Sequence, residues 1–289
     1  MALRGSVTAS PAASSPSSPA RLIAVRRILA GVLLAVVGLG TVFVPWLFYL
    51  AIMVVGLASL YELAKLCEIK GQPLQYPVAM AGVFGYISLA VFHMLQKWEG
   101  VLLAAIVFAA FWLGMYGDQK GYFARTAYTL LSVLYIGKLL TYFVYIREVP
   151  HSGLYWALYA IVLIALTDTS AMIVGSLFGR HRLTRVSPKK TVEGSLGALA
   201  IVTAAAAGLA ITPFLHMAWW QGASLGAFTC LAAQAGDLVE SAFKRDAGVK
   251  DAGSAIVGHG GVLDRFDSYL FGGMAFFAAL HILGFLYPG

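Results

Sequence analysis

Charged side chains are scarce in this 289-residue chain: Asp, Glu, Lys and Arg make up 11% of it, whereas 60% of the residues are hydrophobic. Soluble domains carry roughly 25% charged and 45–50% apolar residues. The polar surface is too small to cover a globule in water, which excludes a soluble enzyme and a disordered chain. The apolar runs are continuous rather than alternating, which argues against a membrane β-barrel. The composition predicts an all-α, polytopic integral membrane protein.

Cysteine is equally scarce, and several nucleotide and metal motifs are missing. The two cysteines, Cys67 and Cys230, fall in or beside apolar stretches. We expect them to be small buried hydrophobic residues rather than a disulfide or a metal pair. The chain contains no Walker A sequence, no His-Glu-x-x-His and no Ser nucleophile elbow. These absences exclude P-loop, zincin and α/β-hydrolase chemistry.

Nine apolar runs have the length of a transmembrane span. They cover residues 28–44, 46–66, 76–95, 100–117, 123–146, 153–179, 194–212, 214–243 and 266–287. Residues 1–27 precede them and are predicted to be a disordered cytoplasmic tail, because the first 20 are rich in Ser, Pro and Ala. A signal peptide is a weaker alternative, since the first apolar run is too long and no cleavage-like site follows.

The spans divide into an apolar scaffold at 28–152 and a catalytic transmembrane region with cytoplasmic loops at 153–289. Eight of the 13 acidic residues lie between Asp168 and Asp267, which places the polar chemistry in the second region.

The distribution of positive charge predicts the orientation in the membrane. With the N-terminus in the cytoplasm, the segments on that side hold 17 of the 20 Lys and Arg residues. The outer segments hold only Lys97 and Arg147, and Lys138 lies within a span. Because positive loops stay on the cytoplasmic side, this bias supports nine spans in the inner or plasma membrane, with the N-terminus inside.

Asp168 lies near the middle of the sixth predicted span. A central Asp costs on the order of 2.5–3.5 kcal/mol on insertion scales, so it must face protein, water or an ion. An ionisable residue inside a span indicates a functional site by default, and this is the interpretation we favour. A packing hydrogen bond to Thr167 or Thr169 is the structural alternative. A third interpretation is an ion or solute transporter, in which Asp168 and Lys138 would be intramembrane charges.

The segment from Gln234 to Asp267 carries the strongest polar pattern. On a helix, its residues Asp237, Glu240, Ser241 and Lys244 share one face. Asp264 and Asp267 are one turn apart at the start of the last span, after a glycine-rich connection. Carboxylates from two helices beside lysines and glycines fit Mg²⁺ and phosphate together, because Mg²⁺ prefers carboxylate, phosphate and water oxygens.

The connection at 179–194 combines five basic residues with hydroxyl groups before a helix start. Lysines, hydroxyls and helix N–H groups suit a polyphosphate. Positive charge beside anionic lipid is the alternative, and charge alone favours that alternative.

Three motifs in the second region stand out. The first runs Ser241-Ala-Phe-Lys244-Arg245-x4-Lys250-Asp251-x-Gly253-x5-Gly258-His259-Gly260-Gly261-x2-Asp264-Arg265-x-Asp267. The second is Ser187-Pro188-Lys189-Lys190-Thr191-x-Glu193-Gly194, and the third is Asp168-Thr169. Together they resemble the motifs of the phosphatidate cytidylyltransferase (CDP-diacylglycerol synthase) family. The chain departs from the family pattern at Val257, where Pro is usual, and at Val192, where Trp is usual. Both replacements are apolar and spare every charged position.

The resemblance implies that the chain forms CDP-diacylglycerol and pyrophosphate from CTP and phosphatidate with Mg²⁺, leaving open a second metal or a monovalent cation. The partners would be these substrates and the lipid bilayer, with no nucleic acid, and a homodimer stays open. The implied catalytic residues are Asp237, Asp264, Lys244, Lys250, Asp251 and His259. The implied substrate-binding residues are Ser187, Lys189, Lys190, Thr191, Arg245, Gly260, Gly261 and Arg265. The implied metal ligands are Asp237 and Asp264, with Asp168 and Asp267 as secondary ones.

Two alternatives remain beside this interpretation. A related CTP-using kinase of a polyprenol would release CDP instead of pyrophosphate. A transporter would drive uptake into vesicles without CTP.

Overall fold

The computed structural model describes residues 38–116, 120–215, 217–249 and 261–286. Within these ranges the chain is helical and contains no β-strand, apart from an isolated bridge between Arg182 and Thr191. The elements are α2 (Pro45–Ile69), α3 (Tyr76–Val91), α4 (Leu95–Gly114), α5 (Tyr122–Ser132), the π-helix η1 (Val133–Lys138), α6 (Leu139–Arg147), α7 (Gly153–Phe178), α8 (Val192–Ala210), α9 (Trp219–Asp246) and α10 (Leu263–Ile282). The all-α prediction is confirmed for the described residues.

Five helical segments are long and apolar enough to cross a membrane. They are Pro45–Ile69, Leu95–Gly114, Tyr122–Arg147, Gly153–Phe178 and Val192–Ala210. The helix α3 is apolar but shorter. The helices α9 and α10 coincide with predicted spans but are not among the five, and most of the first predicted span lies outside the described residues. The count of nine spans and the cytoplasmic N-terminus therefore stay predictions.

Two helices begin earlier than their apolar runs. The helix α4 starts at Leu95 rather than at residue 100, and α10 starts at Leu263 rather than at residue 266. In both cases the first turn carries charged residues, which a search for apolar runs passes over. In α4 the charged residue of the first turn is Lys97. Glu99 follows in the next turn, and its carboxylate accepts a hydrogen bond of 2.5 Å from Lys138 Nζ. The intramembrane lysine is therefore paired with an acid.

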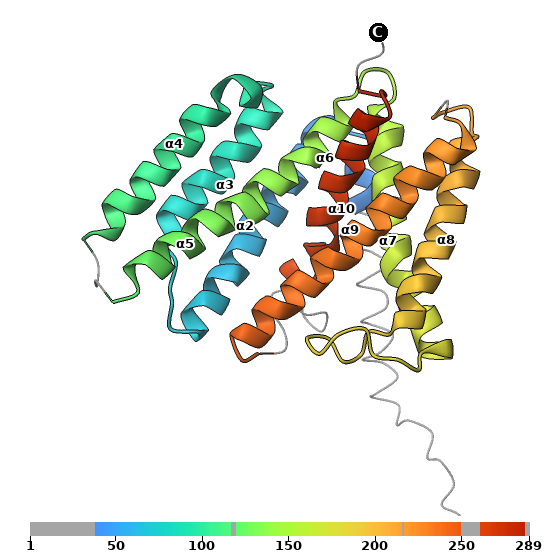
Figure 1. Cartoon of the computed structure of the whole chain (residues 1–289). Helices are drawn as coiled ribbons and strands as arrows, with labels where there is room; N and C mark the ends of the chain where they lie inside the picture. Colours follow the sequence, from blue (N-terminus) through green and yellow to red (C-terminus); the bar gives the residue numbers. More distant parts are fainter. Residues whose placement is uncertain (1–37, 117–119, 216, 250–260, 287–289) are drawn as a thin grey trace, which may run out of the picture.

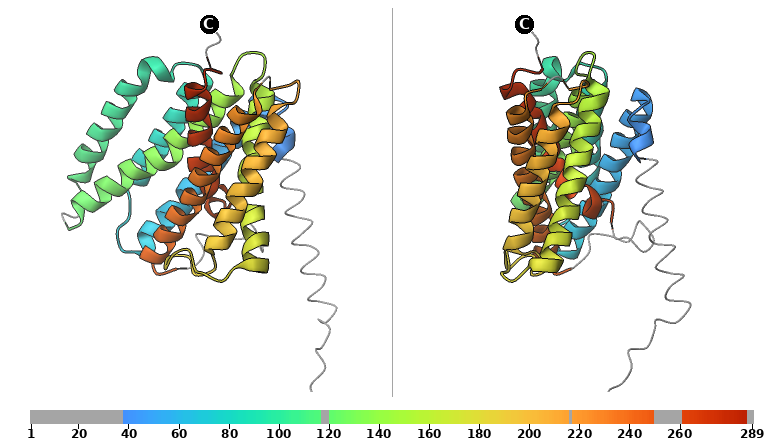
Figure 2. Two further views of the ribbon diagram at one scale, coloured as in Figure 1. Left: turned by 45° about the vertical axis from the view of Figure 1, so that its right-hand side comes forward. Right: turned by 90° about the vertical axis from the view of Figure 1, so that its right-hand side faces the viewer.

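The elements α5, η1 and α6 form one continuous helical stretch. Apart from this stretch, successive helices alternate in direction, and together they form a flat bundle (Figures 1 and 2). The helix α9 packs most extensively against α10 and α8, and α8 packs against α7. The helices α3, α4 and α5 lie together at the opposite side of the bundle (Figure 1). The C-terminal ends of α2 and α9 and the connection between α7 and α8 meet at one end, the lower one in Figure 1.

Small residues bring α9 close to its two neighbours. A Cβ added at Gly226 would lie 2.3 Å from Ala206 Cβ, and one added at Gly222 would lie 2.4 Å from Ala210 Cβ. This four-residue glycine spacing lets membrane helices approach at backbone distance. On the α10 side, a Cβ at Gly236 would lie 2.5 Å from the carbonyl oxygen of Asp267. The polar turns of α9 and α10 are therefore held against each other.

A polar contact joins the ends of α2 and α9. Lys70, just after α2, forms an ion pair with Asp246 and donates a 2.9 Å hydrogen bond to the Tyr128 hydroxyl. The bonds to Asp246 and Tyr128 raise the pKa of Lys70 above its ordinary value. The helices α2 and α5 are thus connected to the C-terminal end of α9.

Both cysteines behave as the sequence predicts. Cys67 and Cys230 are buried and free.

Candidate functional site

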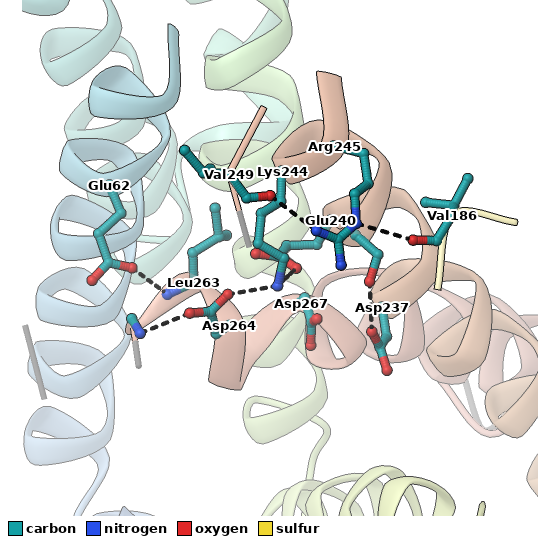
Figure 3. A network of polar contacts seen from close by, with 12 residues as sticks. Glu62, Val186, Asp237, Glu240, Lys244, Arg245, Val249, Leu263, Asp264 and Asp267 are labelled. Atoms are coloured by element: carbon teal, nitrogen blue, oxygen red, sulfur yellow. Dashed lines mark hydrogen bonds and ion pairs between the residues drawn. The ribbon is translucent and has the colours of Figure 1, made fainter. Parts of the chain in front are cut away.

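The polar face predicted for α9 exists and lies against the start of α10 (Figure 3). Lys244 forms ion pairs with Glu240, one turn earlier on its own helix, and with Asp264 of α10. Ser241 Oγ donates a 3.4 Å hydrogen bond to Asp237 Oδ1, also one turn earlier. Glu240 is fully buried. The helical spacing read from the sequence is therefore confirmed.

Asp264 is held through both of its carboxylate oxygens. Oδ1 lies 2.7 Å from Lys244 Nζ, and Oδ2 accepts a 2.8 Å hydrogen bond from the backbone N–H of Gly261. Its side chain is 13% exposed. One contact comes from α9 and the other from the turn before α10, so the position of this carboxylate depends on both elements.

Asp237 is reached by the connection between α7 and α8. Lys190 of this connection forms an ion pair with Asp237, and each side chain keeps about a quarter of its surface exposed. A second tie links the same elements, because Arg245 Nε donates a 3.3 Å hydrogen bond to the carbonyl oxygen of Val186. The basic connection and the polar face of α9 therefore meet in space, although Lys190 and Asp237 lie more than 40 residues apart in the sequence.

The basic connection has a defined conformation of its own. Glu193, in the first turn of α8, accepts a 3.0 Å hydrogen bond from the Arg180 N–H and lies 2.6 Å from His181 Nδ1. Thr191 Oγ1 accepts a 3.1 Å hydrogen bond from the Gly194 N–H and so caps α8. Thr191, expected to bind substrate, therefore has a structural partner already.

The remaining residues of this connection are arranged around its turn. The Ser187 N–H donates a 3.2 Å hydrogen bond to Thr184 Oγ1, and the Ser187 carbonyl accepts one of 3.1 Å from the Lys190 N–H. Lys189 is exposed.

Two further carboxylates, from α7 and α10, complete the acidic part of the site. Ser268 Oγ donates a 3.0 Å hydrogen bond to Asp168 Oδ1, and the Ser268 N–H donates one of 2.6 Å to Asp267 Oδ1. Asp267 is 6% exposed. Ser268 thus joins the carboxylate of α7 to that of α10.

The packing alternative for Asp168 named the wrong partners. The hydroxyl groups of Thr167 and Thr169 donate to carbonyl oxygens of their own helix, at 2.9 and 2.8 Å. The partner of Asp168 is Ser268 of α10, 100 positions along the chain.

The donor set fits a hard cation. The carboxylates of Asp237 and Asp264 offer the oxygen ligands that Mg²⁺ prefers, and each already pairs with a lysine cation. Asp168 and Asp267 offer two further carboxylates. Within those ranges, no three acidic, His or Cys side chains are close enough to form a metal site by themselves. Mg²⁺ commonly uses one or two carboxylates and completes its shell with phosphates and water. The site therefore suits a cation that arrives with phosphate.

Four of the predicted catalytic and binding residues, Lys250, Asp251, His259 and Gly260, lie outside the described residues. Arg265 is exposed on the first turn of α10.

Sequence reasoning missed Glu62, which lies on α2 in the region assigned as scaffold. It is 2% exposed and accepts hydrogen bonds from the N–H groups of Val262 and Leu263, at 2.9 and 2.8 Å (Figure 3). The signal that could have found it is the one that marked Asp168, an acidic residue inside an apolar helix.

The sequence profile described as the cytidylyltransferase family matches residues 24–283 of the chain. The chain belongs to this family. It is 34% identical over 259 residues to the phosphatidate cytidylyltransferase of Bacillus subtilis (strain 168), and the aligned region covers 85% of this chain and 93% of that protein. It is 33% identical over 238 residues to the protein of the same name from Staphylococcus aureus (strain COL), covering 80% of this chain and 90% of that protein. The match spans the helices of both halves, including α2.

Proposed function

We propose that the chain transfers CMP from CTP to phosphatidate, forming CDP-diacylglycerol and pyrophosphate at the membrane. The observation that carries the proposal is the similarity to proteins named for this activity over about nine tenths of their length. The site is consistent with it, because cations and carboxylates alternate at one end of an apolar helical bundle.

The chemistry asks for positioning and charge rather than for a nucleophilic side chain. The phosphate of phosphatidate is already an oxyanion, so its attack at the α-phosphorus of CTP needs little general-base help. The main obstacle is repulsion between two polyanions. Lys190, Lys244 and Arg245 would reduce this repulsion and stabilise the charge that develops on the leaving pyrophosphate. Holding both substrates in line then supplies much of the rate.

Each lysine of the site stands beside a carboxylate, and this alternation suits a ligand that carries both signs. Lys190 pairs with Asp237, and Lys244 pairs with Asp264. Asp237 and Asp264 would hold Mg²⁺, supported by Asp168 and Asp267. When bound, Mg²⁺ supplies charge neutralisation at the phosphate oxygens. The lysines then remain available for the triphosphate and the lipid phosphate.

The proposal includes a location. The site would face the cytoplasm from the inner or plasma membrane, where CTP is available and phosphatidate enters sideways from the inner leaflet. Residues 28–152 would form the scaffold and residues 153–289 the catalytic region. A homodimer stays a prediction of the family resemblance.

A product assay with a matched pair of variants tests the function. Purified protein in mixed micelles receives phosphatidate, α-labelled CTP and Mg²⁺, and label in the lipid phase is measured. We expect lipid labelling by the unmodified chain and a loss of about 10²–10³-fold in Asp264→Asn, the size typical for removing one electrostatic contact in a transition state. Glu68→Gln, at an exposed position of α2, is the control and should be unchanged.

The outcomes separate the parts of the proposal. Full activity in Asp264→Asn would remove this residue from the catalytic set. An absence of lipid label in the unmodified chain, with CDP released when a polyprenol is supplied, would identify a lipid kinase instead.

A further inference from the structure

Glu62 and the start of α10 form a contact that joins the two halves of the chain. Glu62 lies 200 positions before Val262, yet its two carboxylate oxygens accept the N–H groups of Val262 and Leu263. Leu263 is the first residue of α10, and Val262 at the N-cap provides no side-chain hydrogen bond. The first N–H groups of a helix need an acceptor. Here a different helix, α2, supplies it.

A buried carboxylate from another helix is a costly way to cap a helix, which points to a role beyond capping. A carboxylate buried in an apolar helix is unfavourable, and the two N–H groups together with the positive end of the α10 dipole compensate for it. A Ser or Asp at position 262 would cap the helix locally without burying a charge. The carboxylate from α2 instead fixes α10 relative to another part of the bundle.

The same turn also holds Asp264. The N–H of Gly261 donates to Asp264 Oδ2 at 2.8 Å, while the other face of Gly261 packs against Glu62. A Cβ added to Gly261 would lie 2.4 Å from Glu62 Oε2. Glu62 and Asp264 therefore contact adjoining parts of one short backbone segment, residues 261–263, and Figure 3 shows the two carboxylates on either side of it.

We propose that Glu62 is a positioning residue: by fixing the turn at 261–263 it sets the place of the Asp264 carboxylate between Gly261 and Lys244. The inference rests on the proposed function, in which Asp264 takes part in the transfer. Glu62 itself touches no substrate in this scheme and acts only through the backbone of the turn.

Glu62→Gln and Glu62→Asp are the informative pair. The amide of Gln keeps one acceptor oxygen but turns an NH₂ group toward a backbone N–H and removes the negative charge. We expect kcat to fall by about 10–100-fold, the effect of a small misplacement at a reacting centre, while KM for phosphatidate stays within twofold. Asp keeps the charge and both acceptors and should recover a large part of kcat.

The experiment compares the unmodified chain, both Glu62 variants and Glu68→Gln, each as the full chain in mixed micelles. Transfer of labelled CMP gives kcat and KM. Amide hydrogen exchange of the peptide covering residues 261–268 reports on the turn directly. Mn²⁺ binding followed by electron paramagnetic resonance reports on the carboxylates without requiring turnover. We expect Glu62→Gln to exchange faster at 261–268 and to bind Mn²⁺ at least fivefold more weakly, while Glu62→Asp stays close to the unmodified chain in both measurements.

Each result decides the inference. Unchanged kcat, exchange and Mn²⁺ affinity in Glu62→Gln would overturn it. Equal loss of activity in the Gln and Asp variants, with unchanged exchange at 261–268, would reduce Glu62 to a packing residue and overturn it too. If the unmodified chain transfers no CMP but Glu62→Gln still loosens the turn and weakens Mn²⁺ binding, the proposed function fails while the positioning role stands.

Discussion

At the scale of single residues, Lys190 and Lys244 of the candidate site are each paired with carboxylates. Lys190 pairs with Asp237, and Lys244 pairs with both Asp264 and the fully buried Glu240. An unpaired charge in a low-dielectric interior costs several kcal/mol, so these pairs lower the cost of keeping reactive groups at the end of a membrane bundle. The pairs therefore contribute to stability, and under the proposed function the same lysines would bind substrate phosphates.

Lys190 permits a direct test of its role in CTP recognition. In Lys190→Gln we expect kcat/KM for CTP to fall by about 10–100-fold, since a hydrogen bond to a charged group contributes roughly 1.5–3 kcal/mol. Lys190→Arg keeps the charge and should retain part of the activity. Steady-state rates at varied CTP measure the effect. Lys97→Gln, an exposed residue of α4, is the control.

An unchanged kcat/KM for CTP in Lys190→Gln, with lower thermal stability, would show that Lys190 only neutralises Asp237. The comparison with Lys190→Arg matters here, because Arg preserves neutralisation whether or not CTP is bound.

At the scale of helices, the sequence predicts existence and type better than boundaries and pairing. Long apolar runs predicted α2, the continuous stretch from α5 to α6, α7 and α8 with ends close to those observed, because length and hydropathy are properties of each segment alone. The helix α9 begins at Trp219, five residues after the start of its predicted run. The starts of α4 and α10 were missed because their first turns are charged. The contact of Glu62 with α10 could not be predicted, since it depends on how α2 packs against a helix 200 positions away.

The same reasoning applies to the candidate site. The shared face of Asp237, Ser241 and Lys244 follows from helical spacing and was predictable. The ion pair between Lys190 and Asp237 was not, because no spacing relates a loop to a later helix; only the family resemblance grouped them.

Gly226 tests whether close packing of α8 and α9 supports the site. Gly226→Val would place its Cβ 2.3 Å from Ala206 Cβ, so we expect a loss of about 1–3 kcal/mol in unfolding free energy from overpacking. Activity should fall as well, since α9 carries Asp237 and Lys244. Gly208→Val on α8 is the matched control, because a Cβ there has no heavy atom within 4 Å. Thermal unfolding in detergent, followed by tryptophan fluorescence, measures the stability of both variants, and transfer of labelled CMP measures their activity. Equal effects at the two positions would contradict a tight α8–α9 interface.

At the scale of the whole molecule, charge and site lie at the same end of the bundle. The connection between α7 and α8, with its five basic residues, lies at the lower end in Figure 1, and its Lys190 forms an ion pair with Asp237. The start of α4, with Lys97, lies at the upper end. Because positive loops remain in the cytoplasm, the lower end is expected to face it. The same orientation brings the site to the compartment that holds CTP.

Labelling of introduced cysteines tests this orientation directly. The two natural cysteines are buried, so their background reaction with a membrane-impermeant maleimide should be low. Arg185→Cys places a thiol at an exposed position of the α7–α8 connection, and Lys97→Cys places one at an exposed position of α4. In intact cells we expect labelling of Lys97→Cys alone, and in inverted membrane vesicles labelling of Arg185→Cys alone. Labelling of both from one side would contradict an odd number of crossings between them. Labelling with the sides exchanged would put the site outside the cytoplasm, where CTP does not reach it, and the proposed function would fall with the orientation.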